Sequence, residues 1–254
     1  MTTKSLRKHY EKKYASEESD SAIDLVSAPR IPTDRFQAVV RNFPRFFSEG
    51  DILELGAGNG AVAKTLLQSG LSVRTYTLGD ISMPRIEGLR RNLGDPRVSI
   101  MHMDAESIDA SGTKFDAIIM VALIEHLIDP MGAMAGIRQL LRPGGFVYID
   151  TPNIAKFTQR IRLCLGKFPS TASKNEGLTT YAGEPTDLFD EGHLHYFTFR
   201  SLSQMLTTRC GFARVTWCPY PGGSRPLGTR IHAHLAQLWP QMFSELALVA
   251  HAPR

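Results

Sequence analysis

The sequence has few cysteines and no long apolar segment. Its 254 residues include 3 cysteines, Cys164, Cys210 and Cys218, an odd number at wide spacing. This pattern fits neither a disulfide framework nor paired zinc ligands, so we expect a reducing compartment. The longest apolar run, Ala117–Ile124, is far too short to span a bilayer, and the polar N-terminus lacks the apolar region of a signal peptide. The sequence therefore predicts a cytoplasmic protein without a membrane partner.

The chain also lacks the dense basic stripe of a nucleic-acid-binding protein. Its net charge is +4, and its basic residues form only modest clusters within residues 4–13 and 156–167. This distribution argues against nucleic acid as the main partner. With 43% hydrophobic and 21% charged residues, the composition indicates a folded core, and the length suits one domain with added elements.

Short β-rich runs alternate with helical stretches along the chain. This alternation is typical of a parallel sheet with crossover helices, so we predict a doubly wound α/β fold. The predicted strands cover residues 51–55, 72–77, 98–101, 115–121, 146–150, 212–217 and 245–251. Helices are predicted between them, including an added helix at 228–243. The irregular stretch 151–196 is too long for an ordinary connection and is a candidate functional insertion.

A glycine-rich turn follows the first predicted strand and opens a helix. Gly56 and Gly58 let the backbone turn sharply and leave room for a ligand beside the helix N-terminus. Glu54 lies inside the strand, where a buried carboxylate favours a positively charged partner such as an aminoacyl ammonium group. Two alternatives stay open at this point. A dehydrogenase can carry the same turn, because Ala61 completes its spacing, and the glycines can also serve the turn alone.

Acidic residues follow the next two predicted strands. Asp80, with Ile81 beside it, lies about 20 residues after the turn, where a carboxylate grips the hydroxyl groups of a ribose. Its alternative role is to cap the following helix. Asp104 could accept a hydrogen bond from an adenine amine while the Ala105 amide faces the ring. The alternative there is an ordinary surface turn.

The ordered segments ILELGAGNG, GDIS, MDAE, FDAIIMVALIEHL and LRPGGFVYIDTPN together resemble the class I S-adenosylmethionine-dependent methyltransferases over residues 51–153. The resemblance implies a Rossmann-like, mostly parallel seven-stranded sheet with an antiparallel last strand. It also implies a site for S-adenosyl-L-methionine, with S-adenosyl-L-homocysteine as product, formed by Glu54, Gly56, Gly58, Asp80, Ile81, Asp104, Ala105 and Val121. The later segments TPNIAKFTQRIRL, GKFP, DEGHLHYFTFRSLSQML and CGF are similar to those of bacterial sugar, polysaccharide and secondary-metabolite methyltransferases. They are also similar to those of methyltransferase-like proteins associated with methionine biosynthesis.

This resemblance divides the single predicted domain into four parts. An N-terminal helical cover is expected at 1–48, a cofactor-binding core at 49–150, an acceptor-side insertion at 151–197 and the rest of the sheet at 198–254. Tyr10 and Tyr14 share one helical face of the cover. In related enzymes such a segment folds over the cofactor, so Tyr14 is a candidate contact. Packing against the edge of the sheet is the alternative.

Three histidines near predicted loop edges are candidate general bases: His126, His193 and His195. The region that corresponds to His126 in ubiquinone O-methyltransferases looks like an acid-x-x-Glu-His arrangement that holds a divalent metal. Ala122 replaces the first acid here, so we predict no metal. His193 and His195 alternate in an extended segment and face the same side. A structural hydrogen bond is the alternative role for His126, and attachment of the insertion to the core is that for His193.

The function predicted from these features is methyl transfer to a small-molecule acceptor, at the oxygen of a sugar, a carboxylate or a biosynthetic intermediate. Methylation at nitrogen, a cofactor-binding partner protein without transferase activity, and a nicotinamide oxidoreductase are the alternatives. Motifs of amino-directed and cytosine-directed DNA methyltransferases are absent after the fourth predicted strand. A basic cluster could attract a carboxylate or phosphate of the acceptor, or form a solvated helix face: Lys156, Arg160, Arg162 and Lys167. Whether the chain forms a homodimer is left open.

Overall fold

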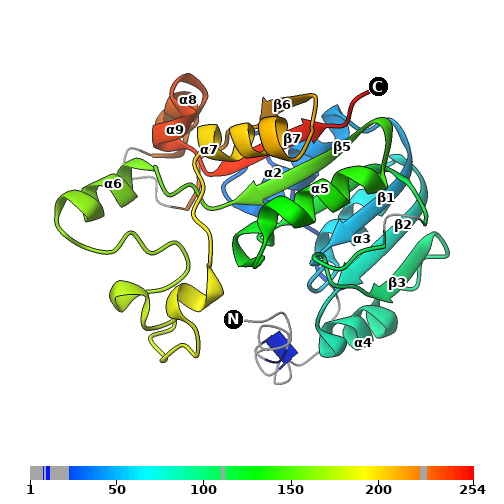
Figure 1. Cartoon of the computed structure of the whole chain (residues 1–254), viewed down its shortest axis with the longest axis horizontal. Helices are drawn as coiled ribbons and strands as arrows, with labels where there is room; N and C mark the ends of the chain where they lie inside the picture. The colour runs from blue at the N-terminus through cyan, green and yellow to red at the C-terminus, as the bar shows by residue number, and fades with distance from the viewer. Residues whose placement is uncertain (1–7, 9, 12–22, 110–111, 224–227) are drawn as a thin grey trace.

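Seven strands form one mixed sheet in the order β3-β2-β1-β4-β5-β7-β6 (Figure 1). The computed structural model describes residues 8, 10–11, 23–109, 112–223 and 228–254. The strands are β1 Glu49–Leu55, β2 Ser72–Asp80, β3 Val98–His102, β4 Phe115–Val121, β5 Leu141–Thr151, β6 Arg214–Trp217 and β7 Leu246–His251. The pairs among β1 to β5 are parallel, whereas β7 runs antiparallel to both β5 and β6. The predicted Rossmann-like sheet with a reversed last strand is therefore confirmed.

Helices cover both faces of the sheet, because successive strand residues point to opposite sides. Ile52 belongs to the core beneath α2 and α3, and Leu53 belongs to the core beneath α5 and α7. The helices are α2 Arg35–Asn42, α3 Ala61–Gln68, α4 Met83–Asn92, α5 Pro130–Leu140, α6 Phe157–Cys164, α7 Phe199–Gln204, α8 Thr229–Leu238 and α9 Pro240–Phe243. Among the described residues, no helix has both the length and the apolar character needed to cross a membrane.

Proline and glycine account for two helix boundaries near the C-terminus. The helix predicted over 228–243 is divided into α8 and α9, because Pro240 has no N–H to donate and begins the second helix. Helix α7 starts with a capping box between Thr198 and Ser201. It then continues as a π-helical turn, Met205–Arg209, before Gly211 takes a φ of 76°.

The insertion after β5 forms a lobe beside the sheet that contains α6 and short turns (Figure 1). Its loops fold around the carboxylate of Asp190, which accepts hydrogen bonds from the hydroxyls of Ser170 at 2.5 Å, Ser173 at 2.7 Å and Tyr196 at 2.9 Å. Burial acts in the opposite direction, but these hydrogen bonds lower the pKa of Asp190 to about 2. A charged anchor thus gives the lobe a defined shape where helical periodicity is lacking.

A second ionic cluster joins four strands of the sheet toward their amino ends. The Arg142 guanidinium of β5 donates to Asp116 of β4 at 2.6 Å and to Asp51 of β1 at 2.8 Å. Thr75 of β2 donates to the same Asp51 carboxylate at 2.9 Å. Partial burial opposes the shift, but the hydrogen bonds from Thr75 and Arg142 lower the pKa of Asp51. Arg142 therefore bridges strands whose ends would otherwise bring two carboxylates together.

We predict that Arg142→Ala lowers the free energy of unfolding by about 1–3 kcal/mol, because the buried Asp51 carboxylate loses a charged partner. Urea unfolding at pH 7 measures the loss. Arg90→Ala, at an exposed position of α4, is the control and should stay within about 0.5 kcal/mol of the wild type. Equal effects of the two substitutions would show that the bridge contributes nothing.

Candidate active site

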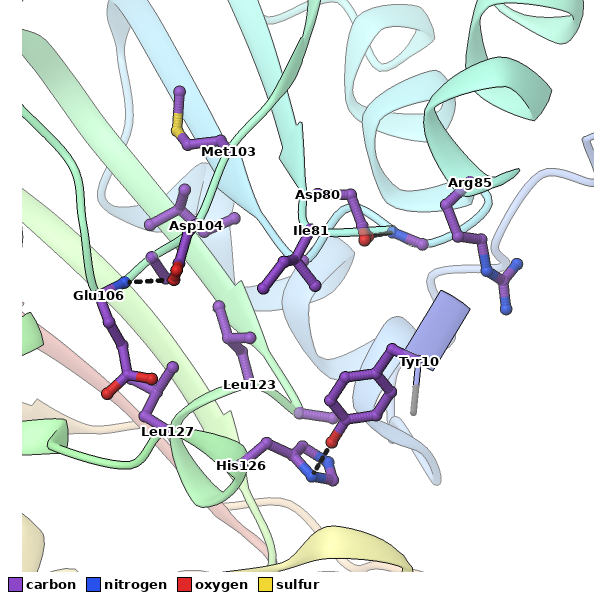
Figure 2. A pocket seen from close by; sticks show the side chains of 15 residues that line it. Tyr10, Asp80, Ile81, Arg85, Met103, Asp104, Glu106, Leu123, His126 and Leu127 are labelled. Atoms are coloured by element: carbon purple, nitrogen blue, oxygen red, sulfur yellow. Dashed lines mark hydrogen bonds between the residues drawn. The ribbon is translucent and has the colours of Figure 1, made fainter. Parts of the chain in front are cut away.

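A cleft of about 830 Å³ lies at the carboxyl ends of the central strands (Figure 2). It is lined by Gly56 after β1, Asp80 at the end of β2, Asp104 after β3 and Leu123 after β4. The strand order reverses here, since β1 lies between β2 and β4. Such a switch point is where open α/β sheets bind their ligands.

The glycine turn follows β1 in left-handed backbone conformations. Gly56, Gly58 and Gly60 have φ angles of 69°, 56° and 79°, which L side chains rarely adopt. A Cβ atom at Gly58 would meet nothing within 4 Å, so the space beside this residue is open. The Gly58 amide donates to Asp80 at 3.1 Å. The turn is therefore tied to the end of the neighbouring strand, directly at the cleft.

Asp80 has features of both roles predicted for it. Its carboxylate lines the cleft, as a ribose-binding group must, and it also accepts the Ser82 amide at 2.9 Å, at the start of α4. Burial raises the pKa of Asp80, although hydrogen bonds from the Ser82 and Gly58 amides act against the shift. Ile81 lines the same wall. The local hydrogen bonds hold the carboxylate in place before any ligand arrives.

Glu54 lies behind the glycine turn, and the residues described as lining the cleft do not include it. Its partner in the structure is Tyr76 of β2, whose hydroxyl donates to the carboxyl group at 2.6 Å. Burial, with a further contribution from the charge of Asp80, raises the pKa of Glu54 to about 8 in spite of the Tyr76 hydrogen bond. The sequence did not indicate this pairing, because Tyr76 carries no recognisable motif.

The third predicted contact region is also at the cleft. Asp104 and Ala105 line it, and Asp104 accepts the amide of Glu106 at 2.9 Å, in the turn that was the alternative interpretation. Of Val121 and Ala122, which the family resemblance predicts at the floor of the site after β4, Ala122 is among the described lining residues and Val121 is not. Ala122 has a φ of 52°, a strained conformation for a non-glycine residue, and strain of this kind is common at functional sites.

Two of the three candidate histidines come together. The rings of His126 and His193 lie edge to face with centroids 4.6 Å apart. Nδ1 of His126 lies 2.7 Å from the Tyr10 hydroxyl (Figure 2). The same nitrogen lies 3.0 Å from the Gly192 carbonyl oxygen. His195 contacts the Ile128 carbonyl oxygen at 3.3 Å, and it does not line the cleft among the described residues.

The N-terminal segment reaches the cleft through Tyr10, which lines it. Tyr14, the predicted cofactor contact, lies outside the described residues. Arg85 of α4 and Met103 after β3 also line the cleft, and motif analysis did not single out either of them. A general rule could have drawn attention to both, since each lies close after the carboxyl end of a parallel strand.

Glu125 completes a cluster with the two histidines. One ligand atom each from Glu125, His126 and His193 lie within 4.8 Å of one another. Oε2 of the buried Glu125 accepts the Thr151 hydroxyl at 2.8 Å, and its Oε1 has no hydrogen-bond partner among the described residues. Two imidazoles and a carboxylate are a ligand set that could hold a divalent metal. The sequence indicated Glu125 and His126 as parts of a metal-binding pattern, but it did not indicate His193, which comes from the insertion.

Comparison with known proteins places this fold and site in a family. The chain matches a family model described as a methyltransferase domain over residues 30–216, well over half of its length. It therefore belongs to this methyltransferase family. The match confirms the class predicted from the motifs, the class I S-adenosylmethionine-dependent methyltransferases, together with the cofactor of that class.

The individual relatives share low sequence identity with the chain. The chain is 27% identical over 110 residues to a ubiquinone biosynthesis O-methyltransferase of Dinoroseobacter shibae, covering 43% of this chain and 44% of that protein. The chain thus spans under half the length of this curated relative. Its fold is similar to that of N-methyltransferase NodS from Bradyrhizobium japonicum with bound S-adenosyl-L-homocysteine, at a TM-score of 0.59 and 15% identity, covering 97% and 100% of the two chains. The fold is also similar to that of human N-acetylserotonin methyltransferase, at a TM-score of 0.53 and 15% identity. This match covers 87% of the present chain and 52% of the human chain.

We predict that stability falls as the pH rises from about 5 to 8. Folded Glu54 keeps a proton up to a pKa of about 8, whereas the unfolded chain releases it near the ordinary value of 4.5. The folded state therefore binds more protons in this window, and each pH unit costs up to about 1.4 kcal/mol. Glu54→Gln should flatten the decline, measured as urea-unfolding free energies at pH 5.5 and 8.

Buried Asp150, whose burial also raises its pKa to about 8, should leave a remaining slope in that variant. Glu87→Gln, at an exposed position of α4, should keep the full decline. Identical pH slopes for the wild type and Glu54→Gln would mean that Glu54 is ionised in the folded protein at neutral pH.

Proposed function

We propose that the protein transfers the methyl group of S-adenosylmethionine to a hydroxyl oxygen of a small-molecule acceptor. The observation that carries this proposal is the position of His126 on the wall of the family's cofactor cleft, with His193 against it. Transfer from a sulfonium is an in-line displacement, so the protein's main task is to align the acceptor with the methyl group. A hydroxyl acceptor also has to lose a proton, which requires a base.

The cofactor would lie along the cleft from β3 to β1. Asp104 and Ala105 would face the adenine, Asp80 would accept the ribose hydroxyls, and the Gly58 turn would hold the methionine end. Asp80 supports this orientation, because its carboxylate is fixed by two backbone amides at the cleft wall. Glu54 would act through the turn, because it lies behind it, and not by direct contact.

His126 is the proposed base. A proton on Nδ1, donated to the Gly192 carbonyl oxygen at 3.0 Å, leaves the basic lone pair on Nε2. Tyr10 holds the same ring from the N-terminal segment. His193, whose Nδ1 lies 2.7 Å from the Thr171 hydroxyl, would position the acceptor beside it. If a metal occupies the Glu125 cluster, His126 would serve as one of its ligands in place of the base role, and the metal would supply charge stabilisation to an ionised acceptor oxygen.

Methylation at nitrogen is the second candidate. NodS, the structure described above whose match covers nearly all of both chains, is named an N-methyltransferase. An amine acceptor also needs less help from a base than a hydroxyl does. A protein that binds the cofactor and acts through a partner is the third.

We predict that Asp80→Ala weakens S-adenosyl-L-homocysteine binding at least tenfold, about 1.4 kcal/mol, because the ribose loses its carboxylate acceptor. Calorimetric titration measures the affinity, and Glu87→Gln should bind as the wild type does. NADH, titrated in parallel, should not bind. Unchanged affinity in Asp80→Ala, with the variant still folded, would remove Asp80 from the cofactor site.

We also predict that His126→Asn lowers methyl transfer by about 10²-fold or more while the affinity for S-adenosyl-L-homocysteine changes less than about twofold. Transfer of labelled methyl to a panel of hydroxyl and amine acceptors measures it. His234→Asn, on the exposed side of α8, is the control. Transfer to amines alone would favour the second candidate, and cofactor binding without any transfer would favour the third. Loss of activity with a chelator, restored by a divalent cation, would assign the cluster to metal binding.

A further inference from the structure

A second cavity, of about 1030 Å³, lies between the insertion lobe and the core. Three cationic residues line it: Arg35 of α2, Lys156 just before α6 and Arg162 within α6. This cavity is separate from the cleft proposed to bind the cofactor. Its lining residues come from α2, from the insertion, and from Gly223 and Glu245 ahead of β7. The space is therefore formed by the fold and not by a single loop.

The charge of the cavity wall is positive. Its one described acidic lining residue is Glu245, which pairs with Lys156. Arg162 is held by a hydrogen bond from its Nε to the Phe168 carbonyl oxygen at 3.1 Å. Arg35 lies near buried Asp150 and Glu125, the latter at 4.0 Å, and although burial acts against the shift, the charges of these two carboxyl groups raise the pKa of Arg35. After these pairings the wall still has cationic character, which favours a carboxylate or phosphate group.

The wall also contains a buried acceptor. Gln159 of α6 lines the cavity, and its Nε2 donates to the Ser170 carbonyl oxygen at 2.9 Å. Its Oε1 is buried and has no hydrogen-bond partner among the described residues. An unpaired buried carbonyl oxygen is costly, so a hydroxyl on a ligand would suit this position. The cavity thus favours an anion that also carries hydroxyl groups.

The histidine cluster separates this cavity from the cofactor cleft. Thr171 lines the second cavity, and its hydroxyl lies 2.7 Å from Nδ1 of His193. The His193 ring contacts the His126 ring, and His126 lines the cleft. A ligand in the second cavity would therefore contact the His193 side of this pair, and its reacting hydroxyl would extend past His193 into the cleft to meet the methyl group.

We propose that this second cavity binds the methyl acceptor, and that the acceptor is a small hydroxylated anion. Its carboxylate or phosphate lies against Arg162 and Arg35, and a hydroxyl points across His193 toward the methyl group. The proposal rests on the proposed function and adds a substrate class to it. Arg160 offers an internal contrast, because it lies on the same helix but is exposed and does not line the cavity among the described residues.

Equilibrium binding of paired probes tests the proposal. 3-Hydroxybenzoate, its uncharged methyl ester and phenyl phosphate are titrated calorimetrically into the full chain, with and without saturating S-adenosyl-L-homocysteine. We expect the acid to bind at least tenfold more tightly than the ester. Arg162→Gln should abolish the difference, Arg162→Lys should restore part of it, and Arg160→Gln should leave it unchanged. Stronger binding of phenyl phosphate than of the acid would identify a phosphate as the preferred group, and the reverse a carboxylate.

Equal binding of acid and ester, no binding of any probe, or equal losses in Arg160→Gln and Arg162→Gln would overturn the proposal. All variants should bind S-adenosyl-L-homocysteine as the wild type does, which separates this site from the cofactor cleft. If neither the wild type nor any variant binds S-adenosyl-L-homocysteine, the proposed function is refuted. The anion affinities measured in its absence would still test the second cavity.

Discussion

The backbone carbonyl of Glu125 holds the two halves of the candidate site together. It accepts the amides of Leu194 at 2.8 Å and His195 at 3.1 Å, which fastens the end of the insertion to the loop after β4. The Glu125 side chain is fixed from the other side by Thr151, at the end of β5. His126 and His193 are neighbours of these anchored residues in the chain, so their contact follows from the same hydrogen bonds. Without these hydrogen bonds, the insertion would not hold His193 beside the proposed base His126.

Backbone strain gathers at this junction. Ala122 has a φ of 52°, and Asp190 and Glu191 have φ angles of 47° and 54°. Such conformations persist where the surroundings over-determine them. The Asp190 carboxylate accepts several hydrogen bonds within the lobe, and the Ala122 amide donates to the Asp150 carbonyl oxygen at 2.9 Å. The fold therefore uses strong local hydrogen bonds to hold unfavourable backbone geometry where a loop and an insertion meet.

The sequence predicted well the features that depend on short-range pattern. Apolar strands and the Gly56 turn have local signals, and parallel strands bring their carboxyl ends together, so Asp80 and Asp104 could be placed at one cleft. The contact of His126 with His193 could not be predicted, because they are 67 residues apart (193 − 126) and the insertion has no periodicity. The partner of Glu54 was missed for a related reason, since Tyr76 reads as an ordinary strand residue.

The two ends of the site differ in how they are specified. The proposed cofactor end consists of strand ends and backbone amides, so its geometry depends on the sheet and on glycine. The proposed acceptor cavity is lined by side chains of the insertion, among them Arg162 and Thr171, together with Arg35 from before β1. Changes in the insertion can therefore alter the acceptor without disturbing the sheet. Since charge and hydroxyl contacts specify a ligand only when the surrounding wall is rigid, the Asp190 anchor makes such a cavity usable.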